Sequence, residues 1–136
     1  MTQTERAPER LIFALFDRIT AQSPEAISAV DGDRRFSYAK MGEVRDQYAK
    51  ALLALGVRRG DRVAMATPPC LDFWILLHAT TSIGAIWVGV NPRYQARDFE
   101  MLISDARPSL LVAVSPFEGR DYVAELAPLL SDGASV

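Results

Sequence analysis

The spacing of apolar side chains predicts a helix near the start of the chain and a hairpin after it. One apolar face repeats every three or four residues and consists of Leu11, Ile12, Leu15, Phe16 and Ile19. That period is typical of an amphipathic helix, and Ser23-Pro24 is expected to end it. Two short runs, 26–30 and 35–37, then flank Asp31-Gly32-Asp33, and a glycine in such a turn favours a β-hairpin.

A longer helix is predicted to follow the hairpin. Its core-facing positions are Met41, Val44, Tyr48, Leu52 and Leu55. Ser37 is placed to cap its start, because a serine hydroxyl can accept a hydrogen bond from a free backbone N–H. Gly56 is expected to close it, because glycine adopts the left-handed conformation that other residues resist.

Strands and helices then alternate along the rest of the chain. The predicted elements are strand 62–66, helix 67–82, strand 85–90, helix 99–106, strand 109–114 and a last helix from about Phe117. Serial strand–helix units favour a parallel sheet with right-handed crossovers. The pattern indicates an α/β fold, with three αβα layers around a small, mainly parallel sheet and an N-terminal β-hairpin to one side.

Particular residues sharpen this prediction. Thr67-Pro68-Pro69 is expected to start its helix, because proline is tolerated in a first turn, and Pro128 is expected to kink or shorten the last helix. The strand 85–90 carries no charge, so we expect it to lie at the centre of the sheet. Trp74 and Trp87 lie in apolar segments and are expected to pack against the sheet.

Length and composition bound the domain and its partners. At 136 residues the chain is expected to form a single domain, or one large piece of a domain, with residues 1–10 as a disordered tail. The net charge is −2 and the sequence pI is about 5.4, so no basic field is expected to attract nucleic acid. The longest apolar run, 73–90, contains polar residues and glycines, so we expect a buried helix and strand there and no transmembrane segment.

The side chains that most often carry chemistry are few. Cys70 and His78 are the only cysteine and the only histidine, which excludes a disulfide and a Cys/His metal site in the monomer. They lie eight residues apart on one predicted helix, roughly 12 Å along its axis, too far for a nucleophile and its base. A phosphate-binding Gly-x-Gly-x-x-Gly or Gly-x-x-x-x-Gly-Lys-Ser/Thr loop does not occur. A single cysteine fits a reducing, cytoplasmic setting.

Carboxylate pairs are interpreted as structural. Asp98 and Glu100 are two residues apart on a predicted helix and face different ways. Glu118 and Asp121 share a face near a helix start, where negative charge complements the helix dipole. No catalytic residue and no metal ligand is therefore expected in this chain.

Three motifs, in order and at natural spacing, resemble one protein family. They are Phe36-Ser-Tyr-Ala-Lys-Met41, Leu55-Gly-Val-Arg-Arg-Gly-Asp-Arg-Val-Ala64 and Gly84-Ala-Ile-Trp-Val-Gly-Val-Asn-Pro-Arg93. The chain from Leu11 onward is similar to the N-terminal region of the AMP-binding, adenylate-forming acyl-CoA synthetases, which are acid–thiol ligases. The resemblance implies a truncated N-terminal α/β subdomain of such an enzyme.

Members of that family activate a carboxylic acid with ATP and Mg²⁺, form an acyl-adenylate, and transfer the acyl group to coenzyme A. The resemblance implies these cofactors for the full-length parent, with a fatty or an aromatic acid as substrate, a role in fatty acid metabolism and a cytoplasmic location. The family's triphosphate loop and its later motifs have no counterpart in this sequence. This chain alone is therefore expected to be catalytically inactive and to need no cofactor.

One family role maps onto a residue of this chain. The resemblance places Arg93 near the nucleotide phosphates of coenzyme A, and a solvated arginine after a strand is the simpler alternative. For the chain as a whole, the alternative is a free-standing small α/β module that binds a partner protein without catalysis. A truncated sheet should also leave an unpaired edge, which predicts self-association of the isolated chain.

Overall fold

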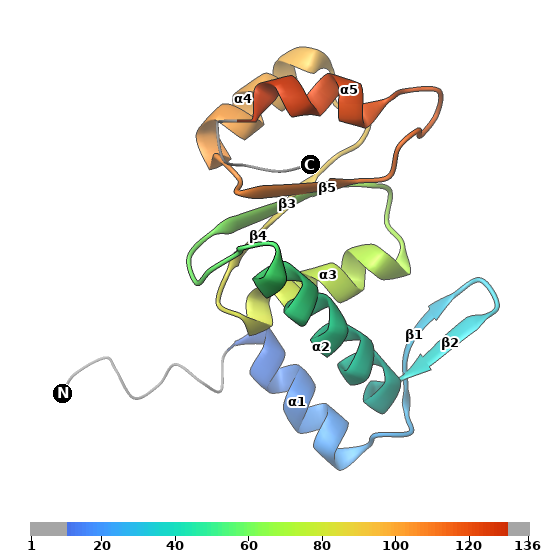
Figure 1. Ribbon diagram of the computed structural model, residues 1–136. Coiled ribbons are helices and arrows are strands. Elements are labelled where there is room, and N and C mark those ends of the chain that lie inside the picture. Colours follow the sequence, from blue (N-terminus) through green and yellow to red (C-terminus); the bar gives the residue numbers. More distant parts are fainter. Residues whose placement is uncertain (1–10, 131–136) are drawn as a thin grey trace.

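A computed structural model describes residues 11–130 of the chain (Figure 1). The predicted tail, residues 1–10, lies outside the described residues. In chain order the elements are α1 (Ile12–Gln22), β1 (Ile27–Asp31), β2 (Arg34–Ser37), α2 (Tyr38–Ala54), β3 (Arg62–Ala66), α3 (Leu71–Ser82), β4 (Ile86–Val90), α4 (Ala96–Ala106), β5 (Leu110–Ala113), α5 (Tyr122–Leu126) and the 3₁₀ helix η3 (Ala127–Leu129).

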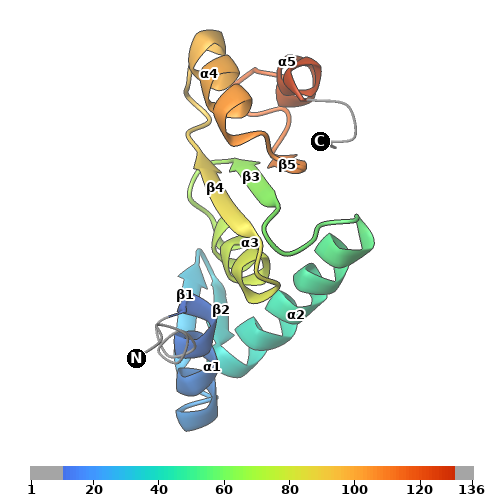
Figure 2. The ribbon, with the colours of Figure 1, turned by 90° about the vertical axis from the view of Figure 1, so that its left-hand side faces the viewer.

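The fold consists of a small parallel sheet between two layers of helices, as the sequence pattern predicts. The strand order is β4-β3-β5, and both pairings are parallel. Helices α2 and α3 lie on one side of the sheet, and α4 and α5 on the other (Figure 2). The separate β1–β2 hairpin is antiparallel, contacts α2 and α3, and lies away from α4 and α5 (Figures 1 and 2).

Strand β3, and not β4, is the centre of the sheet, which corrects the prediction for 85–90. Val63 and Met65 pack with the α2–α3 layer, whereas Ala64 and Ala66 pack with the α4–α5 layer. Strand β4 is an edge, and Ile86 at its start is 51% exposed. The charge of Arg62 does not keep β3 from the centre, because its guanidinium leaves the sheet and donates to the carbonyl oxygens of Ala106 and Arg107 at 2.8 Å.

Local signals gave correct element ends in the first half of the chain. The Ser37 hydroxyl accepts a hydrogen bond from the Lys40 N–H at 3.2 Å and caps α2. Gly56 has φ +92° just after α2, and Gly32 has φ +59° in the hairpin turn. Both are conformations that side chains with a Cβ adopt rarely, so the predicted helix end and hairpin are confirmed.

Two predicted helix starts are wrong. Helix α3 begins at Leu71 with Cys70 as its N-cap, so Pro68 and Pro69 lie in the connection from β3 and not in the first turn. Helix α5 begins at Tyr122, five residues later than predicted. Before it, Glu118 (φ +49°) and Gly119 (φ +78°) form a turn between Phe117 and Arg120 that a helix cannot contain.

The two tryptophans behave differently. Trp87 lies edge-on to Phe73 at 5.0 Å and packs against the core of the α2–α3 layer, as predicted. Trp74 does not pack against the sheet: it is 43% exposed and lies edge-on to His78 at 4.6 Å. The reason is that α1 and the hairpin cover part of the far side of α3, so apolar positions occur on both sides of that helix.

A third apolar cluster attaches α1 and the hairpin to the rest of the fold. Its buried members are Phe16, Met41, Leu71 and Ile75, from α1, α2 and α3.

Among the helices between residues 11 and 130, none combines the length and apolar content needed to cross a membrane.

Candidate functional site at the carboxyl edge of the sheet

The carboxyl ends of β3, β4 and β5 meet at one edge of the sheet, because the three strands are parallel. Ligands of open α/β sheets bind at this edge. The segment after β4, Asn91 to Gln95, carries Arg93, the residue that the sequence singles out. The structure brings this segment against the β5–α5 connection, residues 114–121, which lies some 25 residues further along the chain.

The segment after β4 is a tight turn that leads directly into α4. The Asn91 side-chain oxygen accepts a hydrogen bond from the Arg93 N–H at 2.9 Å. The Gln95 N–H donates to the Asp98 carboxylate at 3.1 Å, as part of a capping box at the start of α4. Asp98 is thus structural, as its sequence position suggests.

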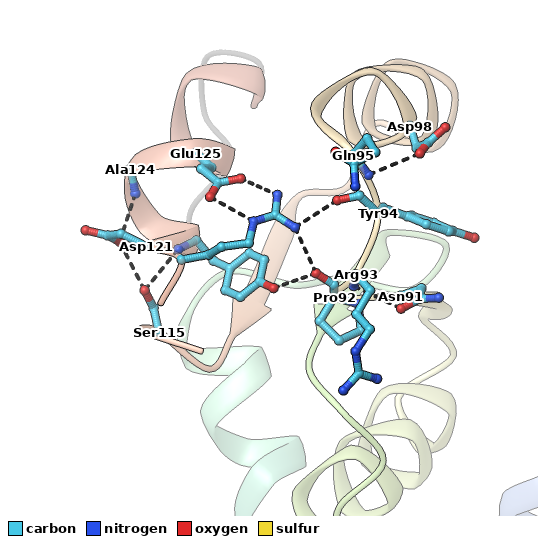
Figure 3. Close-up of polar contacts among 12 residues, drawn as sticks. Asn91, Pro92, Arg93, Tyr94, Gln95, Asp98, Ser115, Asp121, Ala124 and Glu125 are labelled. Atoms are coloured by element: carbon cyan, nitrogen blue, oxygen red, sulfur yellow. Dashed lines mark hydrogen bonds and ion pairs between the residues drawn. The ribbon is translucent and has the colours of Figure 1, made fainter. Parts of the chain in front are cut away.

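Two side chains, Arg120 from the β5–α5 connection and Tyr122 from the start of α5, hold this turn in place through the carbonyl oxygens of Pro92 and Tyr94 (Figure 3). Arg120 donates through Nη1 to the carbonyl oxygens of Pro92 (3.2 Å) and Tyr94 (2.9 Å). The Tyr122 hydroxyl donates to the Pro92 carbonyl oxygen at 2.5 Å. Together they fix the backbone on both sides of Arg93.

Arg120 is itself held by a carboxylate and by aromatic rings. Its guanidinium forms an ion pair with Glu125 and lies 5.3 Å from the centre of the Phe99 ring and 5.1 Å from that of Tyr122. The hydrogen bond between Arg120 and Glu125 raises the pKa of Arg120 and lowers the pKa of Glu125, so both side chains stay charged. A charged arginine with its acceptors fixed is a rigid support for the turn.

The start of α5 is fixed by a second group of hydrogen bonds. Ser115 donates to the Asp121 carboxylate at 3.0 Å, and its hydroxyl accepts from the Tyr122 N–H at 3.0 Å. Asp121 caps α5 by accepting from the Ala124 N–H at 3.2 Å. That backbone hydrogen bond, the largest cause, lowers the pKa of Asp121. Asp121 therefore has the structural role predicted for it, whereas Glu118 lies outside the helix.

Arg93 extends from this supported turn into solvent. Its side chain is 64% exposed, its Nη2 donates to the Glu118 carboxylate at 2.6 Å, and its guanidinium lies 5.9 Å from the centre of the Phe117 ring. The hydrogen bond to Glu118 raises the pKa of Arg93. The planar fork suits a phosphate, and in this conformation a carboxylate occupies it.

Cys70 and His78 lie away from this arginine and away from each other. Cys70 occupies the N-cap position of α3 without a side-chain capping hydrogen bond, and its sulfur lies 3.9 Å from the Thr67 hydroxyl. His78 is 97% buried between Phe16 and Trp74 in the middle of α3. Between residues 11 and 130 no three His, Cys, Asp or Glu side chains cluster in a way that could hold a metal ion.

The buried imidazole predicts a loss of stability in acid. Burial, and then the nearby positive charge of Arg45, lower the pKa of His78 below 6.5, while Asp17 opposes this shift. The unfolded chain therefore binds a proton that the folded chain does not, and the free energy of unfolding should fall as the pH drops below about 6.5. Urea unfolding between pH 7.5 and 5 should show a smaller loss in His78→Phe than in the wild type. An equal loss in both would contradict the prediction.

Sequence reasoning singled out Arg93, whose role stays a prediction, and missed the residues that support its turn. Arg120 and Tyr122 act on backbone carbonyl oxygens 26 to 30 residues earlier in the chain. The only signal for them in the sequence was Arg120 followed by Asp121, which can cap a helix, and by Tyr122. The prediction of a helix from Phe117 placed all three inside that helix, so the signal was missed.

Comparisons with known proteins agree on one family. Residues 16–135 match the family model described as AMP-binding enzyme. The chain is 37% identical over 111 residues to enterobactin synthase component F of Escherichia coli (strain K12), covering 82% of this chain and 8% of that protein. It is 32% identical over 101 residues to the 2-hydroxy-7-methoxy-5-methyl-1-naphthoate–CoA ligase of Streptomyces carzinostaticus, covering 74% of this chain and 18% of that enzyme.

A solved structure shows the same arrangement of elements. The fatty acyl CoA synthetase of Mycobacterium tuberculosis superposes with a TM-score of 0.74 at 26% identity, over 88% of this chain and 22% of that one. The chain therefore spans less than a quarter of the length of each of these three proteins.

Proposed function

Because the chain belongs to the AMP-binding enzyme family, we propose that it is the N-terminal part of an ATP-dependent acid–CoA ligase. Such an enzyme joins a carboxylate to AMP with release of pyrophosphate, and a thiol then displaces AMP from the acyl-adenylate. The observation that carries the proposal is the family match over residues 16–135. The likeness to a naphthoate–CoA ligase and to a fatty acyl CoA synthetase supports coenzyme A as the thiol and a fatty or an aromatic acid as substrate.

Within that enzyme we assign this chain a scaffold role and one contact with a ligand. The described residues contain neither a loop that fits a triphosphate nor a carboxylate cluster that fits Mg²⁺. A nucleotide phosphate of coenzyme A does fit Arg93, which is exposed and held on a rigid turn at the carboxyl edge of the sheet. A cytoplasmic location is part of the proposal, because ATP and coenzyme A are cytoplasmic substrates.

The proposal predicts how activity divides between this chain and a longer one. The purified 136-residue chain should give no acid-dependent exchange of pyrophosphate into ATP with a panel of fatty and aromatic acids. Reading of the coding frame beyond Val136 should reveal a Ser/Thr- and Gly-rich loop followed by lysine, and the longer product should catalyse the exchange. A longer product without exchange, or exchange by the short chain, would contradict the proposal.

The role of Arg93 predicts a separation of the two half-reactions. In the longer ligase, Arg93→Ala should raise the KM for coenzyme A about tenfold and leave pyrophosphate exchange unchanged. A factor of ten corresponds to about 1.4 kcal/mol, roughly the free energy of one charge-assisted hydrogen bond. Glu118→Gln should lower that KM, because it releases the guanidinium from its carboxylate partner. Arg107→Ala, an exposed arginine at the other end of α4, is the control. If Arg93→Ala leaves the KM for coenzyme A unchanged, Arg93 is a solvated arginine only.

A carrier-bound thiol is the second candidate acceptor in place of coenzyme A. Among the three proteins compared, the highest identity, 37%, is to enterobactin synthase component F. Supplying the longer enzyme and an activated acid with either coenzyme A or a phosphopantetheinylated carrier protein would distinguish the two. Transfer to the carrier alone would favour this second candidate.

We also propose that the isolated chain self-associates through its sheet. Among residues 11–130, β4 and β5 each pair with β3 only, and free strand edges promote pairing between chains. Ile86→Lys places a charge on the β4 edge and should shift the 136-residue chain toward monomer in light scattering after size exclusion. Leu53→Lys, at an exposed apolar position of α2, is the matched control and should have a smaller effect. A wild-type chain that is monomeric at high micromolar concentration would refute this proposal.

A further inference from the structure

The turn between β4 and α4 combines a fixed backbone with an exposed central side chain. The N–H groups of residues 93, 94 and 95 donate to the Asn91 side chain (2.9 Å), the Asn91 carbonyl oxygen (3.1 Å) and the Asp98 carboxylate (3.1 Å). The carbonyl oxygens of Pro92 and Tyr94 accept hydrogen bonds from Arg120 and Tyr122. The side chain of residue 93 extends away from these contacts and is 64% exposed (Figure 3).

The start of α4 does not depend on the two donors from the α5 region. A helix start needs acceptors for its first N–H groups, and the capping box of Gln95 and Asp98 supplies them. Arg120 and Tyr122 bind carbonyl oxygens that precede this cap and lie on both sides of Arg93. What they add is therefore a fixed backbone for Arg93.

The Arg120 guanidinium uses its full fork at this position. Nε and Nη2 bind the two carboxylate oxygens of Glu125, and Nη1 donates to both carbonyl oxygens of the turn. The Phe99 and Tyr122 rings lie 5.3 and 5.1 Å from it. A lysine ammonium keeps the charge but cannot reproduce this planar arrangement of donors.

A fixed turn matters for an exposed arginine because mobile groups must be ordered when a ligand binds. Ordering a loop or a long side chain costs free energy, and a preorganised backbone reduces that cost. Arg93 must also leave Glu118 before it can bind another anion, so its backbone position is the part of its geometry that can be set in advance. Resting on the function proposed above, we propose that Arg120 is a positioning residue of the thiol half-reaction. It holds residues 91–95 so that Arg93 meets a nucleotide phosphate of coenzyme A, and it contacts no substrate itself.

Steady-state kinetics of the longer ligase tests this proposal. Arg120→Lys keeps the charge and loses the fork, whereas Tyr122→Phe keeps the buried ring and loses one donor to Pro92. Each should raise the KM for coenzyme A about threefold, which corresponds to one weakened hydrogen bond, and leave pyrophosphate exchange unchanged. In an Arg93→Ala background neither change should raise the KM further, because no guanidinium remains to be positioned.

Two control variants separate positioning from general stability. Arg97→Lys makes the same replacement at an exposed arginine in the first turn of α4 and should leave the KM unchanged. Val63→Ala removes a buried contact in the α2–α3 layer, so it should lower stability and leave the KM unchanged. Hydrogen exchange gives a readout without a ligand: the amides of residues 93–95 should exchange faster in Arg120→Lys than in the wild type, and not in Val63→Ala.

The outcomes distinguish this proposal from the function on which it rests. A raised KM in Arg93→Ala, with an unchanged KM in Arg120→Lys and Tyr122→Phe, would overturn the positioning role and leave the contact of Arg93 with coenzyme A intact. An unchanged KM in Arg93→Ala would overturn that contact and the positioning role together. If Arg120→Lys raises the KM equally in the Arg93→Ala background, or leaves amide exchange at residues 93–95 unchanged, Arg120 does not act through the turn and the proposal is wrong.

Discussion

Replacing Phe99 by alanine is expected to lower the free energy of unfolding by about 3–5 kcal/mol. The ring is 1% exposed and lies edge-on to Tyr94 at 6.0 Å and to Tyr122 at 6.2 Å. Its removal takes away a large apolar surface and leaves a cavity between α4 and α5 that these aromatic neighbours cannot fill. Urea unfolding followed by circular dichroism at pH 7.5 measures the change.

Two variants of the same helix are controls for this effect. Phe99→Leu keeps most of the apolar contact and should cost much less. Met101→Ala changes a side chain that is 65% exposed and should be nearly neutral. Because the Arg120 guanidinium lies over the Phe99 ring, Phe99→Ala should also loosen the turn at residues 91–95, seen as faster amide exchange there. A loss of stability no larger than that of Met101→Ala would contradict this account of the core.

Element boundaries were predictable where short-range chemistry decides them. Ser37 caps the helix that begins next to it, and Gly32 and Gly56 occur where the backbone needs a positive φ. Each of these signals acts within four residues, so the sequence alone contains it. The three-layer architecture follows as well, because alternating strands and helices have few ways to bury their apolar faces.

The order of the strands was not predictable from composition. Strand 85–90 has no charge, yet it is an edge, whereas β3 carries Arg62 and is central. The guanidinium of Arg62 finds carbonyl acceptors 44 and 45 residues later, at the end of α4. A charge count along one strand contains no information about such a partner, so it cannot rank the strands.

In the candidate site, too, features set by neighbouring residues were predictable, and contacts between segments far apart in the chain were not. The position of Arg93, just past the apolar strand that ends at Val90, was evident in the sequence. Its support by Arg120 and Tyr122 depends on how β5 places its following loop beside the turn after β4. The burial of His78 depends in turn on the docking of α1, whose Phe16 ring lies 4.8 Å from the imidazole, and periodicity alone says only that α1 has an apolar face.

Replacing Phe16 by alanine is expected to detach α1 while the sheet stays folded. Phe16 is the one buried apolar side chain of α1, since Ile12 and Leu15 are 51% and 45% exposed. Its ring contacts the Tyr38 and His78 rings at 5.5 and 4.8 Å, and the Arg45 guanidinium lies 5.5 Å from its centre. Removal of this one side chain should cost about 3 kcal/mol, which corresponds to more than a hundredfold increase in local opening of α1.

Hydrogen exchange followed by mass spectrometry measures that opening. Peptides from residues 12–22 should exchange at least a hundredfold faster in Phe16→Ala, whereas peptides from β3 should keep their protection, because Val63 and Met65 belong to a different apolar cluster. Leu15→Ala alters an exposed neighbour in the same helix and should change exchange little. Equal loss of protection in α1 and in β3 would show that the cluster around Phe16 is part of a single cooperative core.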